Sequence, residues 1–244
     1  MTEKIRPHWI EIVIFLGVIS LLSIGAYSRN RLWSDELELW KDCLKKSPQK
    51  ERPHHHLGYL YLNMDRLDDA KEEFETALRL NPRYAASMYN LGLVFFKRGF
   101  IEEAIDCYKK AIHLDPNIPE PFKDLGIAYY QKGLYLQAIE AYQKFLEGKP
   151  DYVNVRVNIG LAYGKLRQWD KAIRSFQEEL EYHPDNSYAY GYLGIVYLEL
   201  EDYSRALLFL RKALTYPDLP NREEIRNVIS AIEARKIEKK AKGD

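Results

Sequence analysis

Small, apolar and aromatic residues recur along most of the chain with a constant spacing of 34 residues. Glycine returns five times at this spacing, at Gly58, Gly92, Gly126, Gly160 and Gly194. An alanine follows each glycine in the same register, at Ala70, Ala104, Ala138, Ala172 and Ala206. Because several residue types keep one register over five copies, the pattern predicts a chain built from five similar units.

Residues 85–118 show what one unit contains. Its first half places apolar residues three and four positions apart, on one face of a helix: Met88, Leu91, Gly92 and Phe95. Gly99 then suits a left-handed helix end. The second half repeats the spacing at Ala104, Tyr108 and Ala111, and Pro116 ends it because proline lacks a backbone donor. The pattern predicts two antiparallel helices that approach closely at the glycine and the alanine.

This order of residues resembles the tetratricopeptide repeat, whose motif is matched here by Leu91-Gly92, Phe95, Ala104, Tyr108, Ala111 and Pro116. The resemblance implies an all-α, right-handed superhelical solenoid of antiparallel helix pairs. It covers five repeats, at 51–84, 85–118, 119–152, 153–186 and 187–220. Phe145 and Glu179 depart from the motif, because they replace the second-helix alanine in repeats three and four, and Leu210 and Pro217 depart from it in repeat five.

Both ends of the array carry amphipathic segments shorter than a repeat. Within residues 33–48, one helical face holds Trp33, Leu37, Trp40 and Leu44. Since Pro48 precedes Pro82 by one period, this segment is predicted to be the second helix of a partial repeat. At the other end, residues 221–240 carry a stripe of Ile225, Val228, Ile229 and Ile232. A terminal helix of this kind covers the last apolar face of a solenoid.

An uncharged segment near the N-terminus predicts a membrane anchor. Residues 12–28 hold 17 residues without a charge, which is about 25 Å of helix and close to the shortest length that spans a bilayer. Trp9 and Tyr27 lie where interfacial aromatics are expected. We expect a single transmembrane helix at 9–28, after a flank at 1–8. A cleaved signal peptide and a buried soluble helix are the alternatives, and basic residues on both sides leave the orientation open.

Composition limits the classes of function. Lys and Arg number 36, as do Asp and Glu, so the net charge is zero and the electrostatic footprint of a nucleic-acid binder is missing. Hydrophobic residues make up 46% and charged residues 30%, which argues against disorder. Two cysteines are too few for a disulfide-rich scaffold. We therefore expect a folded protein without a nucleic-acid partner, and the resemblance to the tetratricopeptide repeat implies a protein or extended peptide as its partner instead.

The sequence offers no case for an enzyme or a cofactor. Three consecutive histidines, at 54–56, would point about 100° apart on a helix, so they cannot converge on one metal ion. No phosphate loop, nucleophile elbow or zinc motif is present. The carboxylate pairs Asp68-Asp69 and Glu102-Glu103 open second helices, where acids favour the helix dipole. We expect neither catalysis nor a bound metal.

In proteins that this chain resembles, the first helix of each repeat lines an inner groove that binds extended peptides. The matching positions are His55, Tyr59, Tyr89, Asn90, Phe96, Lys123, Ile127, Tyr130, Asn158, Leu161, Tyr188 and Tyr192. Asn90 and Asn158 match a position whose amide often holds a ligand's backbone, and an amide suits this role because it both donates and accepts. The alternative is that several of these rings pack between neighbouring helices.

These observations favour a membrane-anchored scaffold that binds a protein or peptide in its groove. A second hypothesis comes from a resemblance near the N-terminus. Residues 29–33, Leu39-Trp40 and residues 46–48 resemble the last span and repeat tail of multi-span membrane glycosyltransferases. Those enzymes keep their catalytic acids in earlier spans that this chain lacks. The resemblance would imply a non-catalytic tail or subunit, with the repeats outside the cytoplasm. A scaffolding subunit of an assembly or secretion machine is a third hypothesis.

Overall fold

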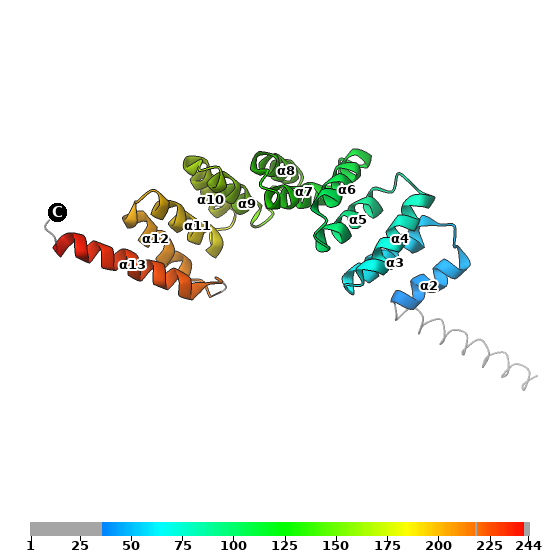
Figure 1. Cartoon of the computed structure of the whole chain (residues 1–244), viewed down its shortest axis with the longest axis horizontal. Coiled ribbons are helices and arrows are strands. Elements are labelled where there is room, and N and C mark those ends of the chain that lie inside the picture. Colours follow the sequence, from blue (N-terminus) through cyan, green and yellow to red (C-terminus); the bar gives the residue numbers. More distant parts are fainter. Residues whose placement is uncertain (1–35, 218, 242–244) are drawn as a thin grey trace, which may run out of the picture. The chain divides into compact units, whose positions relative to one another are not determined.

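The computed structural model describes residues 36–217 and 219–241, and this part of the chain folds into twelve helices without a strand (Figure 1). It divides into two compact units, one ending at Val94 and the other starting at Phe95. The predicted flank at 1–8 and the predicted anchor at 9–28 lie outside the described residues. In the part that is described, no helix combines the length and the apolar character needed to cross a membrane.

The first unit holds α2 (Glu36–Lys46), α3 (Glu51–Asn63), α4 (Leu67–Leu80) and the start of α5 (Ala85–Lys97). Helices α3 and α4 pack against each other as the pair expected for repeat one, and α2 packs against α3. The Trp40 ring of α2 stacks on the His56 ring of α3, with the ring centroids 3.9 Å apart. This stack holds α2 against α3.

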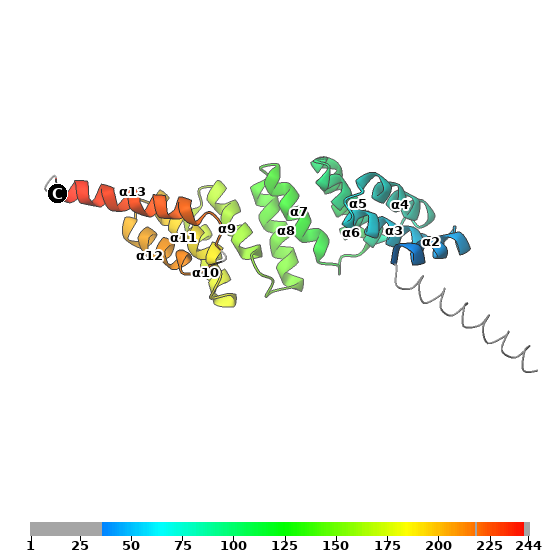
Figure 2. The same cartoon turned by 90° about the horizontal axis from the view of Figure 1, so that it is seen from below.

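The second unit contains the end of α5 followed by eight complete helices. They are α6 (Ile101–Leu114), α7 (Glu120–Gln131), α8 (Tyr135–Gly148), α9 (Val155–Lys165), α10 (Trp169–Tyr182), α11 (Ser187–Glu199), α12 (Tyr203–Leu214) and α13 (Arg222–Ala241). The pairs α7–α8, α9–α10 and α11–α12 are each in contact, and Figure 2 shows α7 and α8 side by side. Contacts of α8 with α9 and of α10 with α11 join one pair to the next.

The periodic glycines let the two helices of a pair approach closely. A Cβ atom added at Gly160 would lie 2.5 Å from the Phe176 ring, and one at Gly126 would lie 2.6 Å from the Tyr142 ring. A side chain at these positions would therefore push the facing ring out of place. The five alanines of the 34-residue register are each 0% exposed. The register read from the sequence is therefore a packing register, in which Gly58, Gly126, Gly160 and Gly194 each face a large side chain of the second helix.

The first helix of each repeat ends in the same turn. The second residue after the end of the helix has a positive φ in every repeat: Asp65, Gly99, Gly133, Arg167 and Glu201. The next amide donates back to the carbonyl of the periodic aromatic residue, for example from Arg66 to Tyr61 at 2.9 Å and from Asp202 to Tyr197 at 2.9 Å. This is the Schellman arrangement, which satisfies carbonyls at the end of a helix. Glycine occupies only two of the five positions, so the turn tolerates other residues.

The two residues that replace the second-helix alanine of the motif have different structural roles. Phe145 is buried, and its ring meets Tyr152 edge-on with the ring centroids 5.0 Å apart. Glu179 is 0% exposed, and its Oε1 accepts hydrogen bonds from the Asn154 amide and from the Asn186 side chain, both at 2.8 Å. Asn186 also donates to Asn154 Oδ1 at 2.9 Å. Glu179 therefore joins the loop before α9 to the loop before α11.

Helix α13 packs against α12 and against the hydrophobic cluster of the last repeats. Ile229 and Ile232 of α13 are buried, while Ile225 and Val228 pack against the same hydrophobic cluster, which includes Leu193. The connection to α12 is closed by Arg222, which donates to the backbone carbonyls of Leu214 and Tyr216. The stripe of four aliphatic residues on this otherwise polar helix is thus a packing surface.

Candidate functional site

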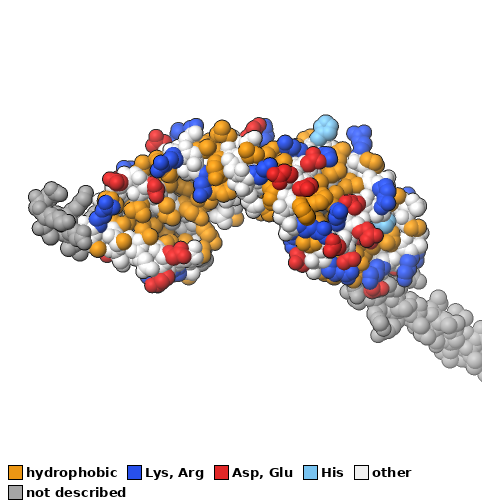
Figure 3. Space-filling model, viewed as in Figure 1, with side chains coloured by type: hydrophobic (Ala, Val, Ile, Leu, Met, Phe, Trp, Pro, Cys, Tyr) orange, Lys and Arg blue, Asp and Glu red, His pale blue; other side chains and the backbone are white. Residues whose placement is uncertain are grey.

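An open pocket with a volume of about 450 Å³ lies in the second unit between α9 and α11. Helix α7 contributes Tyr130, α9 contributes Leu161, and α11 contributes Tyr192 and Ile195. Figure 3 shows one face of the molecule, on which hydrophobic side chains gather over α11 and its neighbours. We call this the α9–α11 pocket. A few large side chains around an open volume of this size suit one or two apolar side chains of a ligand.

The α9–α11 pocket exists because Gly164 lacks a side chain. The same position in other repeats holds Phe96, Tyr130 and Leu198, which are all bulky. A Cβ atom added at Gly164 would meet only the Trp169 ring, at 3.9 Å. The absence of a side chain at this position therefore leaves the space open, whereas the close approach of the helices depends on Gly160.

Two tyrosines form firm walls of the pocket. The Tyr192 ring stacks on Phe176, with the centroids 5.8 Å apart, and the Tyr130 ring meets Tyr135 edge-on at 5.3 Å. Burial raises the pKa of both Tyr130 and Tyr192 above the ordinary value for tyrosine. Their hydroxyls therefore stay protonated at neutral pH and are able to donate hydrogen bonds to a ligand.

Charged residues of both signs surround the apolar interior. Lys165 and Arg167 lie at the end of α9 and Glu199 at the end of α11. The Arg167 guanidinium lies 5.9 Å from the centroid of the Trp169 ring. An apolar pocket with a mixed charged rim is a general feature of protein interaction sites.

The structure brings three of the twelve predicted groove residues together in this pocket: Tyr130, Leu161 and Tyr192. Five others lie in the second unit outside the pocket lining, namely Phe96, Lys123, Ile127, Asn158 and Tyr188. Among these, the Lys123 ammonium lies 3.6 Å from the Asp124 carboxylate and 5.6 Å from the Tyr152 ring centroid. These contacts already engage the one predicted basic residue.

The four remaining predicted residues, His55, Tyr59, Tyr89 and Asn90, lie in the first unit. Tyr59 is exposed, whereas His55 and Asn90 are buried. Nδ1 of His55 lies 2.9 Å from the Ser87 hydroxyl, and burial lowers the pKa of this histidine to about 4. His55 is therefore a packing residue that stays neutral at physiological pH.

The three consecutive histidines have three separate environments. His54 Nδ1 lies 2.6 Å from a Glu73 carboxylate oxygen, His55 contacts Ser87, and His56 stacks on Trp40. Throughout residues 36–217 and 219–241, no three histidine, cysteine or acidic side chains group in a way that could hold a metal ion. Each ring thus supports the packing of α3 against a different neighbour.

The prediction from sequence missed several residues of the pocket. Gly164, Arg167, Trp169 and Glu199 line it but were not among the groove positions. One signal was available, because Gly164 stands in a column whose other members are bulky. Arg167 and Trp169 carry no comparable signal, since Arg167 lies in the turn after α9 and Trp169 is the first residue of α10.

Antiparallel helix pairs, a periodic packing register and an apolar surface pocket define a helical repeat scaffold. Residues 92–133 and 128–166 match the family model described as TPR repeat, and residues 157–221 and 52–84 match two models described as Tetratricopeptide repeat. Together these matches cover more than half of the chain. The chain therefore belongs to the tetratricopeptide repeat proteins, as the sequence predicted.

Solved structures with the same fold support this assignment. The structure of YrrB, described as a TPR protein with an unusual peptide-binding site, is 21% identical, covers 79% of this chain and 98% of its own, and has a TM-score of 0.69. A crystal structure of MamA is 29% identical, with coverage of 64% and 93% and a TM-score of 0.59. A MamA fragment from Desulfovibrio magneticus RS-1 is 18% identical, with coverage of 68% and 93% and a TM-score of 0.64. Among curated proteins, no sequence matches this chain significantly.

Proposed function

We propose that this chain is a non-catalytic scaffold that binds a protein or an extended peptide, with the α9–α11 pocket as its anchoring site. The observation that carries the proposal is the open volume of about 450 Å³ between Tyr130, Leu161, Tyr192 and Ile195. Aromatic residues that are already held in place cost little entropy on binding, so they are good binding hot spots. An apolar side chain of the partner would fill the space that Gly164 leaves.

Filling the pocket tests this proposal directly. Gly164→Phe places a ring where Phe96 and Tyr130 stand in other repeats, so the fold is expected to accept it. A displayed library of random linear peptides is selected on the full-length protein, and the affinities of the enriched peptides are then measured. We expect Gly164→Phe to weaken them by roughly tenfold or more, which corresponds to about 1.4 kcal/mol.

The matched control is Leu208→Ala, which removes an exposed apolar side chain of α12 that does not line the pocket. This variant is expected to bind the selected peptides as the unmodified protein does. Equal binding by Gly164→Phe, or a library that yields no specific peptide, would contradict the proposal. Thermal unfolding of each variant shows whether any loss of binding reflects loss of fold.

We further propose that residues 9–28 anchor the scaffold in a membrane as a single span. The support is the uncharged run of 17 residues with Trp9 and Tyr27 at its ends. The full chain is expected in the membrane fraction after alkaline carbonate washing, and a chain lacking residues 1–28 is expected in the supernatant. We propose that the repeats lie on the extracytoplasmic side. Protease added to intact spheroplasts should then digest them, whereas protected repeats would lie in the cytoplasm.

A second candidate function is a non-catalytic subunit of a membrane glycosyltransferase system. It is favoured by the sequence at 29–33 and 46–48, where the chain resembles the junction between the last span and the repeat tail of such enzymes. Co-purification of the full-length protein with a multi-span transferase would support it, and purification without one would favour the general scaffold.

A further inference from the structure

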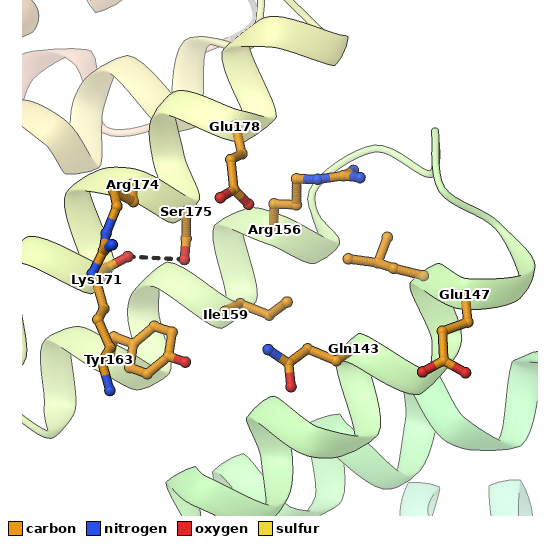
Figure 4. Close-up of a pocket in the computed structure, with 10 residues that line it drawn as sticks. Gln143, Glu147, Arg156, Ile159, Tyr163, Lys171, Arg174, Ser175 and Glu178 are labelled. Carbon is orange, nitrogen blue, oxygen red and sulfur yellow. Dashed lines mark hydrogen bonds between the residues drawn. The ribbon is translucent and has the colours of Figure 1, made fainter.

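A second recess lies on another face of α9, away from the α9–α11 pocket. It has a volume of about 690 Å³ and is bordered by α8, α9 and α10 (Figure 4). Ile159 and Tyr163 of α9 lie along its base, with Gln143 and Glu147 of α8 on one side and Ser175 and Glu178 of α10 on the other. We call it the α8–α10 trough. Its lining mixes apolar and charged groups, unlike the α9–α11 pocket.

One end of the α8–α10 trough is formed by a buried arginine. Arg156 is 7% exposed, and its guanidinium carbon lies 3.8 Å from the centroid of the Tyr182 ring. Within the described part of the chain, its Nη1 is buried and has no hydrogen-bond partner. A buried guanidinium donor without an acceptor is costly. The positive charge of Arg156 therefore lacks a hydrogen-bonded acceptor at Nη1, and the residue lines an open recess in which an anion would lie close to it.

The other end of the trough carries two more cations. Lys171 and Arg174 lie on the first two turns of α10, and the Lys171 ammonium is 5.3 Å from the Tyr163 ring centroid. In Figure 4, the Arg156 guanidinium points away from these two side chains. Arg156 and Tyr163 are separated by about two turns of α9, or roughly 10 Å. The trough thus has positive charge at both ends and Ile159 between them.

Two acidic residues reduce this charge without cancelling it. The Glu147 carboxylate is engaged by Lys144, whose ammonium donates to both of its oxygens at 2.9 and 3.2 Å. Glu178 remains as an acid that is not neutralised in this way, beside three cations. The remaining positive charge is divided between the two ends of the trough, which suits two separate carboxylates better than one compact phosphate.

We propose that the α8–α10 trough binds an acidic peptide segment of a partner protein, with one carboxylate at Arg156 and another at Lys171 and Arg174. In an extended segment, side chains two and four residues apart lie about 7 and 13 Å apart. Acidic residues with these spacings bracket the rise of roughly 10 Å along α9 between Arg156 and Tyr163, the residue that Lys171 contacts. Apolar residues between them would contact Ile159, Leu146 and Tyr163. The site is separate from the α9–α11 pocket, so the scaffold holds two ligands at once.

The test uses the full-length protein, in a mild detergent where needed, and a fluorescein-labelled peptide with the sequence Glu-Leu-Glu-Leu-Glu and an amidated C-terminus. Its matched control is the peptide Gln-Leu-Gln-Leu-Gln. We expect fluorescence polarisation to show binding of the acidic peptide only, with an affinity that falls as salt is raised. Arg156→Gln is expected to weaken binding by roughly tenfold, and Arg174→Gln by about threefold.

Two further variants keep the proposal falsifiable if Arg156→Gln fails to fold. Glu178→Gln removes an exposed acid from the trough and is expected to tighten binding by about threefold. Lys212→Gln, on α12, is the matched control, since Lys212 also lies over tyrosine rings but outside the trough, and it is expected to change nothing. Gly164→Phe is expected to leave this peptide bound, which separates the trough from the pocket.

Three results would overturn the proposal. The first is equal binding of the acidic and the glutamine peptides. The second is an affinity unchanged in both Arg174→Gln and Glu178→Gln. The third is displacement of the peptide by inorganic phosphate at concentrations where acetate has no effect, because that result would assign the trough to phosphate instead. Displacement by acetate and phosphate in proportion to ionic strength alone shows that neither ion has a site of its own in the trough, which leaves the acidic peptide as the ligand.

Discussion

At the scale of single residues, the most informative position is Glu179. The repeat motif has alanine there, and the position is fully buried in this protein. The carboxylate accepts from the Asn154 amide and the Asn186 side chain, and His183 Nδ1 lies 3.0 Å from it. Asn154 has a φ of 69°, so the hydrogen bond also holds a left-handed residue in place. A buried acid has thus become part of the contact between two repeats.

We expect Glu179→Ala to destabilise the protein, although it restores the motif. Two buried donors would lose their acceptor, at a cost of about 2–3 kcal/mol in the free energy of unfolding. The matched control is Glu178→Ala, which removes the neighbouring exposed carboxylate and should change stability by less than about 0.5 kcal/mol. Urea denaturation followed by circular dichroism measures both. A Glu179→Ala protein as stable as the control would show that the network contributes nothing.

His55 is expected to make the protein sensitive to acid. Burial lowers its pKa from 6.5 to about 4, and nearby His56 acts in the same direction. The unfolded chain therefore binds a proton more readily than the folded chain. The stability linked to His55 is fully present above pH 6.5 and is lost as the pH falls from 6.5 towards 4, by at most roughly 3 kcal/mol.

His55→Phe provides the control for this pH dependence. The ring keeps its packing against Tyr84 but no longer titrates, while the loss of the Ser87 hydrogen bond lowers stability equally at every pH. Urea denaturation at pH 7.5, 5.5 and 4.5 should show a smaller loss of stability in the variant than in the unmodified protein. Parallel losses in the two proteins would assign the acid sensitivity to other groups.

At the scale of helices, α11 contains two glycines with opposite roles. A Cβ atom added at Gly194 would lie 2.5 Å from Leu210, whereas one added at Gly191 would meet only Leu219, at 3.9 Å. Gly194→Ala is therefore expected to cost about 1–3 kcal/mol through overpacking. Gly191→Ala is expected to stabilise the protein by about 0.5–1 kcal/mol, because alanine favours a helix more than glycine does.

Thermal unfolding of these two variants provides a paired measurement within one helix. Replacing Gly194, which belongs to the 34-residue register, should lower the melting temperature. Replacing Gly191, which does not, should raise it. Changes of the same sign would contradict the interpretation of the register as a contact between helices. The comparison is sharp because the residues are less than one turn apart.

The paired helices could be predicted from the sequence because a recurring contact leaves a recurring residue type. Gly160 faces Phe176 in the structure, and Gly126 faces Tyr142 one period earlier. The packing requirement therefore appears in the sequence as a glycine and an aromatic residue that recur at a fixed spacing. The stripe on α13 was predictable for a similar reason, since Ile229 and Ile232 face one cluster. Features that recur neither between repeats nor along a helix leave no such trace.

The Glu179 network and most of the α9–α11 pocket belong to this second kind. Glu179 was visible as a departure from the motif, but its role depends on where two loops, at Asn154 and Asn186, come together. The pocket depends on a missing side chain at Gly164 and on a tryptophan from the next helix. Single-copy features of this kind require coordinates, because no repetition in the sequence reveals them.

At the scale of the whole molecule, the chain combines a repeated framework with two unrepeated recesses in its second unit. The zero net charge hides a local difference, since the α9–α11 pocket is mainly apolar and the α8–α10 trough is bordered by three cations. A scaffold of this kind gains specificity from positions where one repeat differs from the others. Gly164 and Arg156, in repeat four, are two such positions.

The most direct test of the account is a methyl NMR spectrum of the full-length protein, labelled at isoleucine, leucine and valine, with and without a peptide selected from the random library. Binding at the α9–α11 pocket should shift the methyl signals of Leu161, Ile195 and Val196, and Gly164→Phe should abolish those shifts. Shifts confined to residues elsewhere, or shifts that persist in Gly164→Phe, would contradict the claim that this pocket is where the scaffold holds its partner.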